Sequence, residues 1–225
     1  MPLRIITGRA GTGKTTACLA EMKQCPAVLI VPEQYSFHMG KELLEDAPVT
    51  GFDGTQVYSF RRLASLLEGE VAGRVREMMS GGEKSILLSY LLLKNKDRFG
   101  VVKPRLSSVG EMSELIAELK KYRVEPDRLR EVGDRLPDSL LKRKIEDVLL
   151  LYEEYESFPK TDTEDRFALL AANAEQSETV MEREIYIDQF TGFLPQEICV
   201  IRALLRTAPR VTVILTMDEG DEAPF

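Results

Sequence analysis

The chain has 225 residues, of which 44% are hydrophobic and 30% are charged, and its formal net charge is −7. This composition is typical of a globular protein, and no stretch reaches the ~18 consecutive apolar residues that a transmembrane helix needs. The acidic balance argues against a dedicated nucleic-acid-binding domain, whose charge is usually basic, and the single histidine, His38, excludes histidine-rich metal sites.

The first predicted element is a short apolar strand over residues 3–7, and a glycine-rich loop follows it. The loop reads Gly-Arg-Ala-Gly-Thr-Gly-Lys-Thr over residues 8–15 and leads into a helix predicted over residues 13–24. This is the Gly-x-x-x-x-Gly-Lys-Ser/Thr phosphate loop between a strand and a helix, which is the context that the motif requires. Its glycines allow backbone N–H groups to surround a phosphate, and the helix N-terminus adds a partial positive charge.

The loop predicts a binding site for a nucleoside triphosphate. Lys14 is expected to reach the β- and γ-phosphates, and the Thr15 hydroxyl is expected to take one position on Mg²⁺. The predicted nucleotide-binding residues are Gly8, Arg9, Ala10, Gly11, Thr12, Gly13, Lys14, Thr15 and Thr16. The alternative interpretation is a structural turn that binds no nucleotide.

Further apolar strands alternate with helical patterns along the chain. The later strands are predicted over residues 27–31, 56–58, 184–188 and 210–216, and two further helices over residues 36–45 and 59–67. Such alternation predicts a parallel sheet covered by helices on both faces. Residues 28–31 are apolar throughout, as expected of a strand that is buried on both sides. We therefore predict the α/β fold of a P-loop NTPase.

Residues 75–180 differ from the rest, because they contain no convincing strand and carry apolar residues at helical spacing. Glycines and prolines separate the successive helices. We predict an all-helical subdomain over residues 75–180, inserted into an α/β core that comprises residues 1–74 and 181–225. A sheet of this kind would normally continue beyond the last predicted strand, so the chain is expected to be the N-terminal piece of a longer protein.

The predicted strand over residues 184–188 ends on an acidic residue, Asp188. A phosphate loop needs a carboxylate at the end of a neighbouring strand to hold Mg²⁺, so Asp188 is predicted to bind the metal together with Thr15. In hydrolysing helicase-type enzymes the next residue is usually a glutamate that polarises the attacking water. Here it is Gln189, whose amide is a very poor proton acceptor. We predict impaired hydrolysis, with Gln189 at the position of the catalytic base.

Several segments together resemble superfamily 1 helicases. Residues 8–16 resemble the first helicase motif, and residues 31–37 lie where the next motif falls. Residues 57–64 are similar to the segment that carries a Thr-x-His-x-Phe pattern and touches single-stranded DNA. With residues 186–197, the combination looks most like the N-terminal region of the AddB family, whose members belong to AddAB-type ATP-dependent helicase–nucleases. The helical insertion matches this family only in position and character.

The resemblance implies a RecA-like core that binds ATP and Mg²⁺. It also implies a heterodimer with an AddA-type helicase–nuclease subunit that processes double-strand DNA ends for recombinational repair. Ser59, Phe60 and Arg61 become candidate DNA contacts, although Phe60 is equally expected in the core between strand and helix. The iron–sulfur cysteines of the family belong to its far C-terminal part, so the three cysteines here are not interpreted as cluster ligands. Their lack of even pairing predicts reduced thiols in a cytoplasmic protein.

Two other classes of function remain open. One is an active superfamily 1 DNA helicase, of which this chain would be a fragment and in which Gln189 would have to support hydrolysis. The other is a small-molecule kinase with a P-loop. That class needs an acceptor pocket and usually an arginine-rich lid, and residues 75–180 display neither clearly.

Overall fold

The computed structural model describes residues 3–45, 54–73 and 77–217. The chain divides into two compact units, one of residues 1–76 with 166–225 and one of residues 77–165. We call them the sheet unit and the helical unit. Within the described residues, no helix combines the length and the apolar character needed to span a bilayer.

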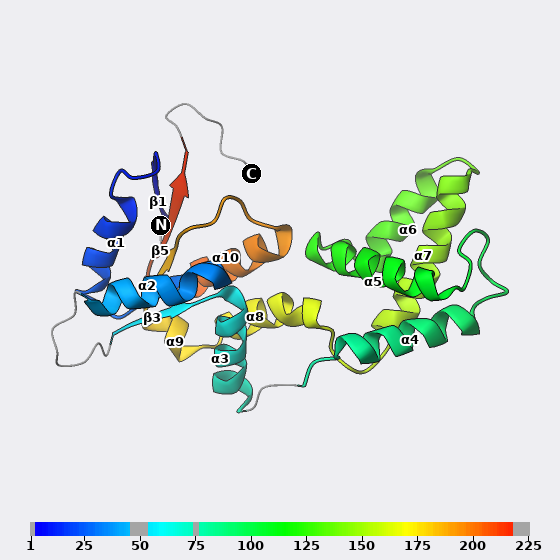
Figure 1. Cartoon of the computed structure of the whole chain (residues 1–225), viewed down its shortest axis with the longest axis horizontal. Helices are drawn as coiled ribbons and strands as arrows, with labels where there is room; N and C mark the ends of the chain where they lie inside the picture. The colour runs from blue at the N-terminus through cyan, green and yellow to red at the C-terminus, as the bar shows by residue number, and fades with distance from the viewer. Residues whose placement is uncertain (1–2, 46–53, 74–76, 218–225) are drawn as a thin grey trace. The chain divides into compact units, whose positions relative to one another are not determined.

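The sheet unit is built around five parallel strands, which confirms the predicted α/β class with a parallel sheet (Figure 1). The strands stand side by side in the order β1-β5-β4-β2-β3. Their bounds are β1 Leu3–Gly8, β2 Ala27–Ile30, β3 Thr55–Tyr58, β4 Glu184–Ile187 and β5 Val211–Thr216. Because every strand runs the same way, the loops that follow all five strands leave from one edge of the sheet.

Helices cover both faces of this sheet, as the continuous apolar strands predict. Alternate residues of one strand enter different hydrophobic clusters: Val28 and Ile30 pack on one side, whereas Ala27 and Leu29 pack on the other. The first side is covered by α3, α8 and α10, and the second side by α1 and α2. The helices of the sheet unit are α1 Lys14–Met22, α2 Glu33–Glu45, α3 Phe60–Ala72, α8 Arg166–Ala174, α9 Glu178–Met181 and α10 Pro195–Thr207.

The compact helical unit is narrower than the insertion assigned from the sequence, which ran over residues 75–180. The difference lies mainly in α8 and α9. Phe167, Ala171 and Leu170 of α8 pack into the hydrophobic cluster under the sheet, together with residues of α3 and α10. The helical periodicity of this segment is real, but its apolar side belongs to the sheet unit rather than to the inserted helices.

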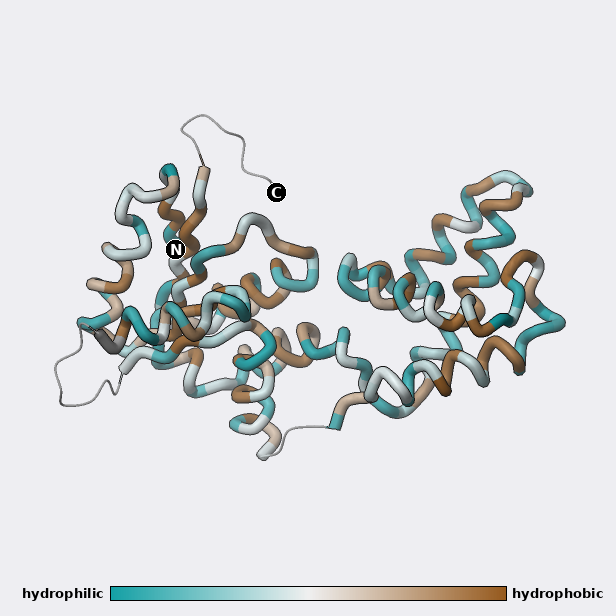
Figure 2. The backbone as a smooth tube through the Cα atoms, in the orientation of Figure 1, coloured by the Kyte–Doolittle hydropathy of each residue, from teal (hydrophilic) through white to brown (hydrophobic). Residues whose placement is uncertain are grey.

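The helical unit contains no strand in the part that the structure describes. Its elements are α4 Gly81–Lys94, α5 Leu106–Lys121, α6 Pro126–Arg135, α7 Leu140–Glu156 and the 3₁₀ turn η1 Thr163–Asp165. Ser80 begins α4 with a capping box, since its hydroxyl accepts a bond from the Glu83 N–H and the Glu83 carboxylate accepts one from the Ser80 N–H. Hydrophobic residues recur along its helices (Figure 2), and its core includes Leu88, Leu92 and Ile116, each at most 1% exposed.

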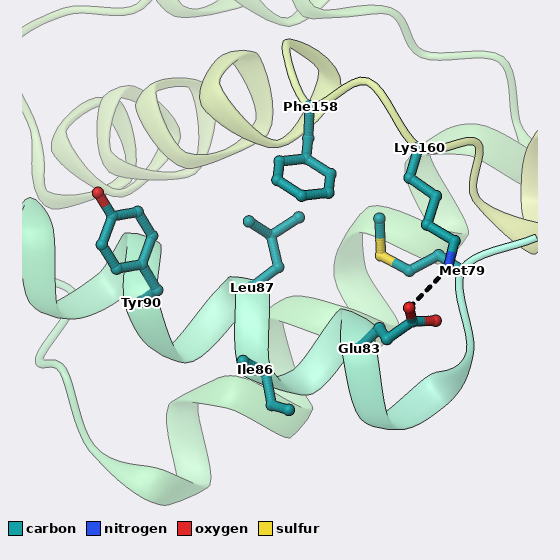
Figure 3. A pocket seen from close by; sticks show the side chains of 7 residues that line it. All are labelled: Met79, Glu83, Ile86, Leu87, Tyr90, Phe158 and Lys160. Carbon is teal, nitrogen blue, oxygen red and sulfur yellow. Dashed lines mark hydrogen bonds and ion pairs between the residues drawn. The ribbon is translucent and has the colours of Figure 1, made fainter.

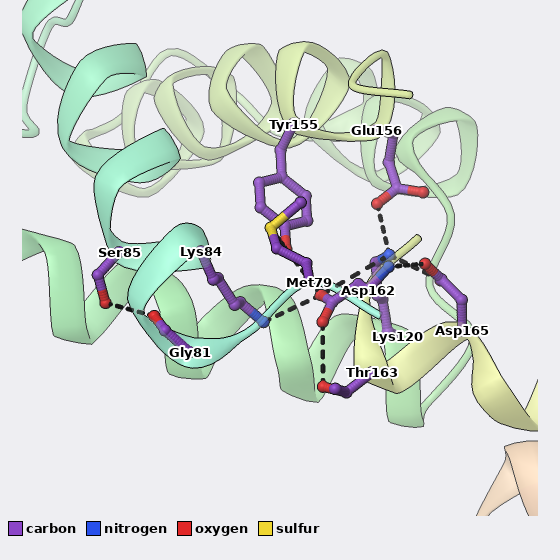
Figure 4. A network of polar contacts seen from close by, with 10 residues as sticks. All are labelled: Met79, Gly81, Lys84, Ser85, Lys120, Tyr155, Glu156, Asp162, Thr163 and Asp165. Atoms are coloured by element: carbon purple, nitrogen blue, oxygen red, sulfur yellow. Dashed lines mark hydrogen bonds and ion pairs between the residues drawn. The ribbon is translucent and has the colours of Figure 1, made fainter. Parts of the chain in front are cut away.

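The chain enters and leaves the helical unit side by side, because the Met79 N–H donates to the Thr161 carbonyl over 2.9 Å. Buried polar side chains surround this crossing (Figure 4). The Lys84 ammonium lies 3.0 Å from the Asp162 carboxylate, and the Tyr155 hydroxyl donates to the same carboxylate over 2.8 Å. Burial by itself would raise the pKa of Asp162, but these two partners outweigh it and lower that pKa.

A second buried lysine completes the cluster. The Lys120 ammonium lies 2.7 Å from a carboxylate oxygen of Glu156 and 2.7 Å from one of Asp165, and its side chain is only 7% exposed. Burial by itself would lower the pKa of Lys120, but the bonds to Asp165 and Glu156 outweigh it and raise that pKa. Burial raises the pKa of Glu156. We call this set the neck cluster, comprising Lys84, Lys120, Tyr155, Glu156, Asp162 and Asp165.

Candidate functional site

The glycine-rich loop follows β1 and ends where α1 begins. Gly11 and Gly13 have φ angles of +77° and +81°, in the left-handed region that favours glycine. Gly13 is the residue that precedes the first turn of α1. A Cβ atom at Gly8 would lie 3.1 Å from the Thr12 hydroxyl oxygen, which is tighter than an ordinary contact. The glycine spacing is therefore what this loop conformation requires.

Lys14 holds its positive charge inside the loop. Its ammonium donates to the carbonyl of Gly8 over 2.6 Å and to that of Arg9 over 2.7 Å. The Thr12 hydroxyl donates to the same Arg9 carbonyl over 2.9 Å. A cation ringed by the loop backbone at the start of a helix is an arrangement that attracts phosphate oxygens, because the helix N-terminus adds to its field.

The carboxylate predicted from the end of the fourth strand meets the loop. The Thr15 hydroxyl donates to Asp188 over 2.6 Å, although the two residues are 173 positions apart in the chain. Asp188 is 4% exposed, and its own N–H donates to the Ile30 carbonyl of the neighbouring strand over 3.0 Å. The structure thus brings together the two residues that the sequence analysis assigned to Mg²⁺.

These two oxygens suit one kind of metal ion. A hydroxyl and a carboxylate are the hard oxygen ligands that Mg²⁺ prefers, and protein Mg²⁺ sites often use one or two carboxylates and complete their shell with substrate phosphates and water. Among the described residues, no group of three or more His, Cys, Asp or Glu side chains could hold a metal ion. Thr15 and Asp188 could supply two oxygen ligands to a Mg²⁺ ion whose remaining positions are filled by phosphate oxygens and water.

Gln189 lies directly against this pair. Its backbone adopts a φ of +66°, which is uncommon for a residue other than glycine and recurs at functional sites. The amide nitrogen of its side chain lies 3.4 Å from the Thr15 hydroxyl and 3.5 Å from the Asp188 carboxylate. An amide in this place can donate to oxygens and orient a water molecule, but it cannot take up a proton at neutral pH.

The three candidate DNA contacts have different surroundings. Ser59 is buried and caps α3, since its hydroxyl accepts a bond from the Arg62 N–H over 3.3 Å. Phe60 is 4% exposed, and its ring packs against Phe167 and Phe190 at centroid distances of 6.0 and 5.4 Å. A base can therefore stack on Phe60 only if the ring leaves the core. Arg61 is exposed at the N-terminal end of the same helix.

One contact at this edge was missed from the sequence. The Ser59 hydroxyl donates to the carboxylate of Glu33, which joins the beginning of α3 to the beginning of α2. Glu33 follows β2 and Ser59 follows β3, and these two strands pair in parallel, so their ends lie side by side. Knowing the order of the strands would therefore have predicted that the two residues meet. On α2, Phe37 is 83% exposed, so it does not pack in the core of the sheet unit.

Comparison with known proteins adds an independent observation. Residues 5–224 match the family model described as "ADDB, N-terminal". The AddB subunit of the ATP-dependent helicase/deoxyribonuclease is 34% identical over 231 residues in Clostridium kluyveri, and 36% identical over 236 residues in Desulforudis audaxviator. The corresponding protein from Moorella thermoacetica is 36% identical over 239 residues. These alignments cover 97% of this chain and 20–21% of the relatives, so the chain spans about a fifth of their length.

Proposed function

Because this chain belongs to the AddB family and matches its N-terminal region, we propose that it is the nucleotide-binding, helicase-like part of a subunit of an ATP-dependent helicase/deoxyribonuclease. The membership confirms the resemblance inferred from the sequence. The single observation that supports nucleotide binding most is the contact of 2.6 Å between Thr15 of the loop and Asp188 at the end of β4. It joins the glycine-rich loop to the carboxylate that we propose as a metal ligand.

The fold that we propose is the RecA-like form of a P-loop NTPase. In its support, the loop follows β1, the carboxylate follows β4, and β5 lies between these two strands. The site is thereby formed at the carboxyl edge of a parallel sheet, where α/β folds bind their ligands. Residues 8–16 would surround the phosphates of ATP, with Lys14 compensating their charge. Thr15 and Asp188 would hold Mg²⁺ against them.

We propose that hydrolysis at this site is weak. General-base catalysis contributes on the order of 10²–10⁴ in rate, and it requires a group that accepts a proton from the attacking water. Gln189 faces the Thr15–Asp188 pair but offers only an amide there. The bound nucleotide would then act as a ligand that orders the loop and α1 rather than as fuel that this part of the subunit consumes.

DNA and a second subunit are the partners that we propose. The relatives are named as subunits of a helicase/deoxyribonuclease, which implies another subunit and a DNA substrate for those proteins. An AddA-type helicase–nuclease subunit and the ends of broken DNA fit this description in the present case, in a cytoplasmic complex that serves recombinational repair. Of the three candidate DNA contacts, Arg61 is the one whose side chain is exposed, so it is the first that we expect to touch a phosphate.

Titration of Mg²⁺-ATP into the protein tests this proposal. The wild-type chain and Lys14→Ala are compared by calorimetry, with Lys41→Ala on α2 as a matched exposed lysine of the same unit. We expect Lys14→Ala to lose binding and Lys41→Ala to retain it. Phosphate release is followed alongside, with and without single-stranded DNA.

The outcomes separate the possible functions. Binding without turnover, in the presence and absence of DNA, supports a nucleotide-binding subunit that does not hydrolyse ATP by itself. Turnover stimulated by DNA would make Gln189 a working catalytic residue and contradict weak hydrolysis. If the wild-type chain binds no nucleotide, the loop is a structural turn and the proposed site is wrong.

A further inference from the structure

Helix α4 is apolar on two sides. Its buried side places Leu88 and Leu92 in the core of the helical unit, where they are 0% and 1% exposed. On its other side, Ile86, Tyr90 and Leu93 follow one another at spacings of four and three residues and are 72%, 60% and 62% exposed. An amphipathic surface helix presents polar residues to solvent, whereas a helix with apolar residues all round is normally buried.

A hollow of about 350 Å³ lies beside this side of α4 (Figure 3). Phe158, which follows the end of α7 and is 45% exposed, forms its opposite wall. The Lys160 ammonium donates to the Glu83 carboxylate over 2.5 Å at one end of the hollow. The exposed side of α4 and this hollow form one surface, which we call the α4 face; its apolar members are Met79, Ile86, Leu87, Tyr90, Leu93 and Phe158.

The area of the α4 face restricts what can cover it. An aromatic side chain presents about 150–250 Å², and Leu or Ile presents somewhat less. The four exposed members of the face, Ile86, Tyr90, Leu93 and Phe158, therefore present on the order of 400 Å² together. A stable interface between separate proteins buries about 800 Å² on each partner. The α4 face by itself is therefore too small for a dimer of this chain. It suffices for a segment of the same polypeptide, because the covalent connection makes that contact intramolecular and removes the cost of associating two separate molecules.

The length of the relatives provides such a segment. They are about five times as long as the part that matches this chain. We propose that the α4 face packs against an amphipathic helix from the part of the same subunit that lies outside these 225 residues. The helix inserts an apolar side chain of the size of Leu or Phe into the hollow and keeps its charged residues outward, near the ion pair of Glu83 and Lys160. This inference rests on the proposed function, in which the chain is one region of a longer subunit.

Cysteine labelling tests the inference. Ile86→Cys is introduced on the α4 face, and Leu140→Cys at the start of α7 serves as control, because both native side chains are 72% exposed. The rate of maleimide labelling at each position is measured by peptide mass spectrometry in the 225-residue chain and in the full-length subunit. We expect Ile86→Cys to react at least 10-fold more slowly in the full-length subunit and Leu140→Cys to react at similar rates in both proteins.

Each alternative occupant gives a different result. Equal rates for Ile86→Cys in both proteins would overturn the inference. If Ile86→Cys already reacts slowly in the 225-residue chain, the covering surface belongs to this chain and the inference is overturned. A labelling rate that depends on protein concentration would then identify that surface as a second copy. Protection of the full-length subunit that appears only after the partner subunit is added would replace the tethered helix by that partner. Mg²⁺-ATP binding by both variants is measured in parallel, so a failure of the nucleotide site is detected separately.

Discussion

Replacing Gln189 by glutamate gives the sharpest test of how the proposed nucleotide site is arranged. The amide nitrogen of Gln189 lies 3.5 Å from the Asp188 carboxylate, and Asp188 is buried. A glutamate in the same position puts a second negative charge within about 4 Å of the first. At an effective dielectric constant of about 20 two such charges repel by up to about 4 kcal/mol. Solvent near the partly exposed Gln189 side chain reduces this, so we expect Gln189→Glu to lose about 1–2 kcal/mol of unfolding free energy at pH 7.5 without divalent ions.

Mg²⁺ should reverse this loss. Two carboxylates and the Thr15 hydroxyl form a set of oxygen ligands that can hold the ion without nucleotide, whereas the wild-type pair of Thr15 and Asp188 depends on phosphates to complete the shell. Urea unfolding is monitored by circular dichroism at 0 and 10 mM Mg²⁺ for the wild type, Gln189→Glu and the uncharged control Gln189→Ala. We expect Mg²⁺ to stabilise Gln189→Glu alone and to leave the other two nearly unchanged.

The same variant also reports on catalysis. If Gln189 occupies the position of the base, its replacement by glutamate should raise phosphate release by on the order of 10²-fold or more once the nucleotide is bound. The reasoning is refuted if Gln189→Glu is as stable as Gln189→Ala without Mg²⁺ and gains nothing from the ion. That result would mean that residue 189 does not face Thr15 and Asp188.

Four further predictions concern other parts of the structure. Lys120→Met should destabilise the helical unit by about 1–3 kcal/mol in urea unfolding, because it removes the ammonium that pairs with Glu156 and Asp165, whereas Lys84 still pairs with Asp162. The pKa of Asp162 is lower in the folded protein than in the unfolded chain, so its stabilisation is present above about pH 4 and is lost as the pH falls through the folded-state pKa. The acid limb of a stability–pH curve should therefore be shallower for Asp162→Asn than for the wild type. Phe60→Ala should cost about 3–5 kcal/mol of unfolding free energy, since its ring is buried. Arg61→Ala should keep the melting temperature but weaken binding of single-stranded DNA in fluorescence anisotropy, and an unchanged affinity would remove Arg61 from the interface.

Local patterns predicted the elements that surround the proposed nucleotide site. The loop motif requires a strand before it and a helix after it, so β1 and α1 could be placed within a few residues of their observed bounds. Asp188 could be assigned because a polar residue directly after a buried apolar strand lies at the carboxyl edge of a parallel sheet. Both inferences depend on residues that are close in sequence.

Tertiary packing decided what the sequence left open. The apolar period of α8 is the same whether the helix packs on the inserted helices or under the sheet, and only the pairing with α3 and α10 distinguishes the two. The burial of Phe60 depends on Phe167 and Phe190, which are more than 100 positions away in the chain. The orientation of Gln189 follows from its left-handed backbone, and a single glutamine carries no sequence signal for that conformation.

The hydrogen bond between Met79 and Thr161 holds the two ends of the helical unit together. For the sheet unit, the insertion therefore has the same effect on the chain path as a short loop. Closing a flexible loop costs only about 0.6 kcal/mol for each doubling of its length, so about 90 residues would cost roughly 3 kcal/mol more than a four-residue turn even without internal structure. The segment folds around a hydrophobic core of its own, which reduces that cost further. The strand register of the sheet is therefore insensitive to how much chain is inserted at this point. In these terms, an insertion of a different length at this point would leave the geometry of the proposed nucleotide site unchanged.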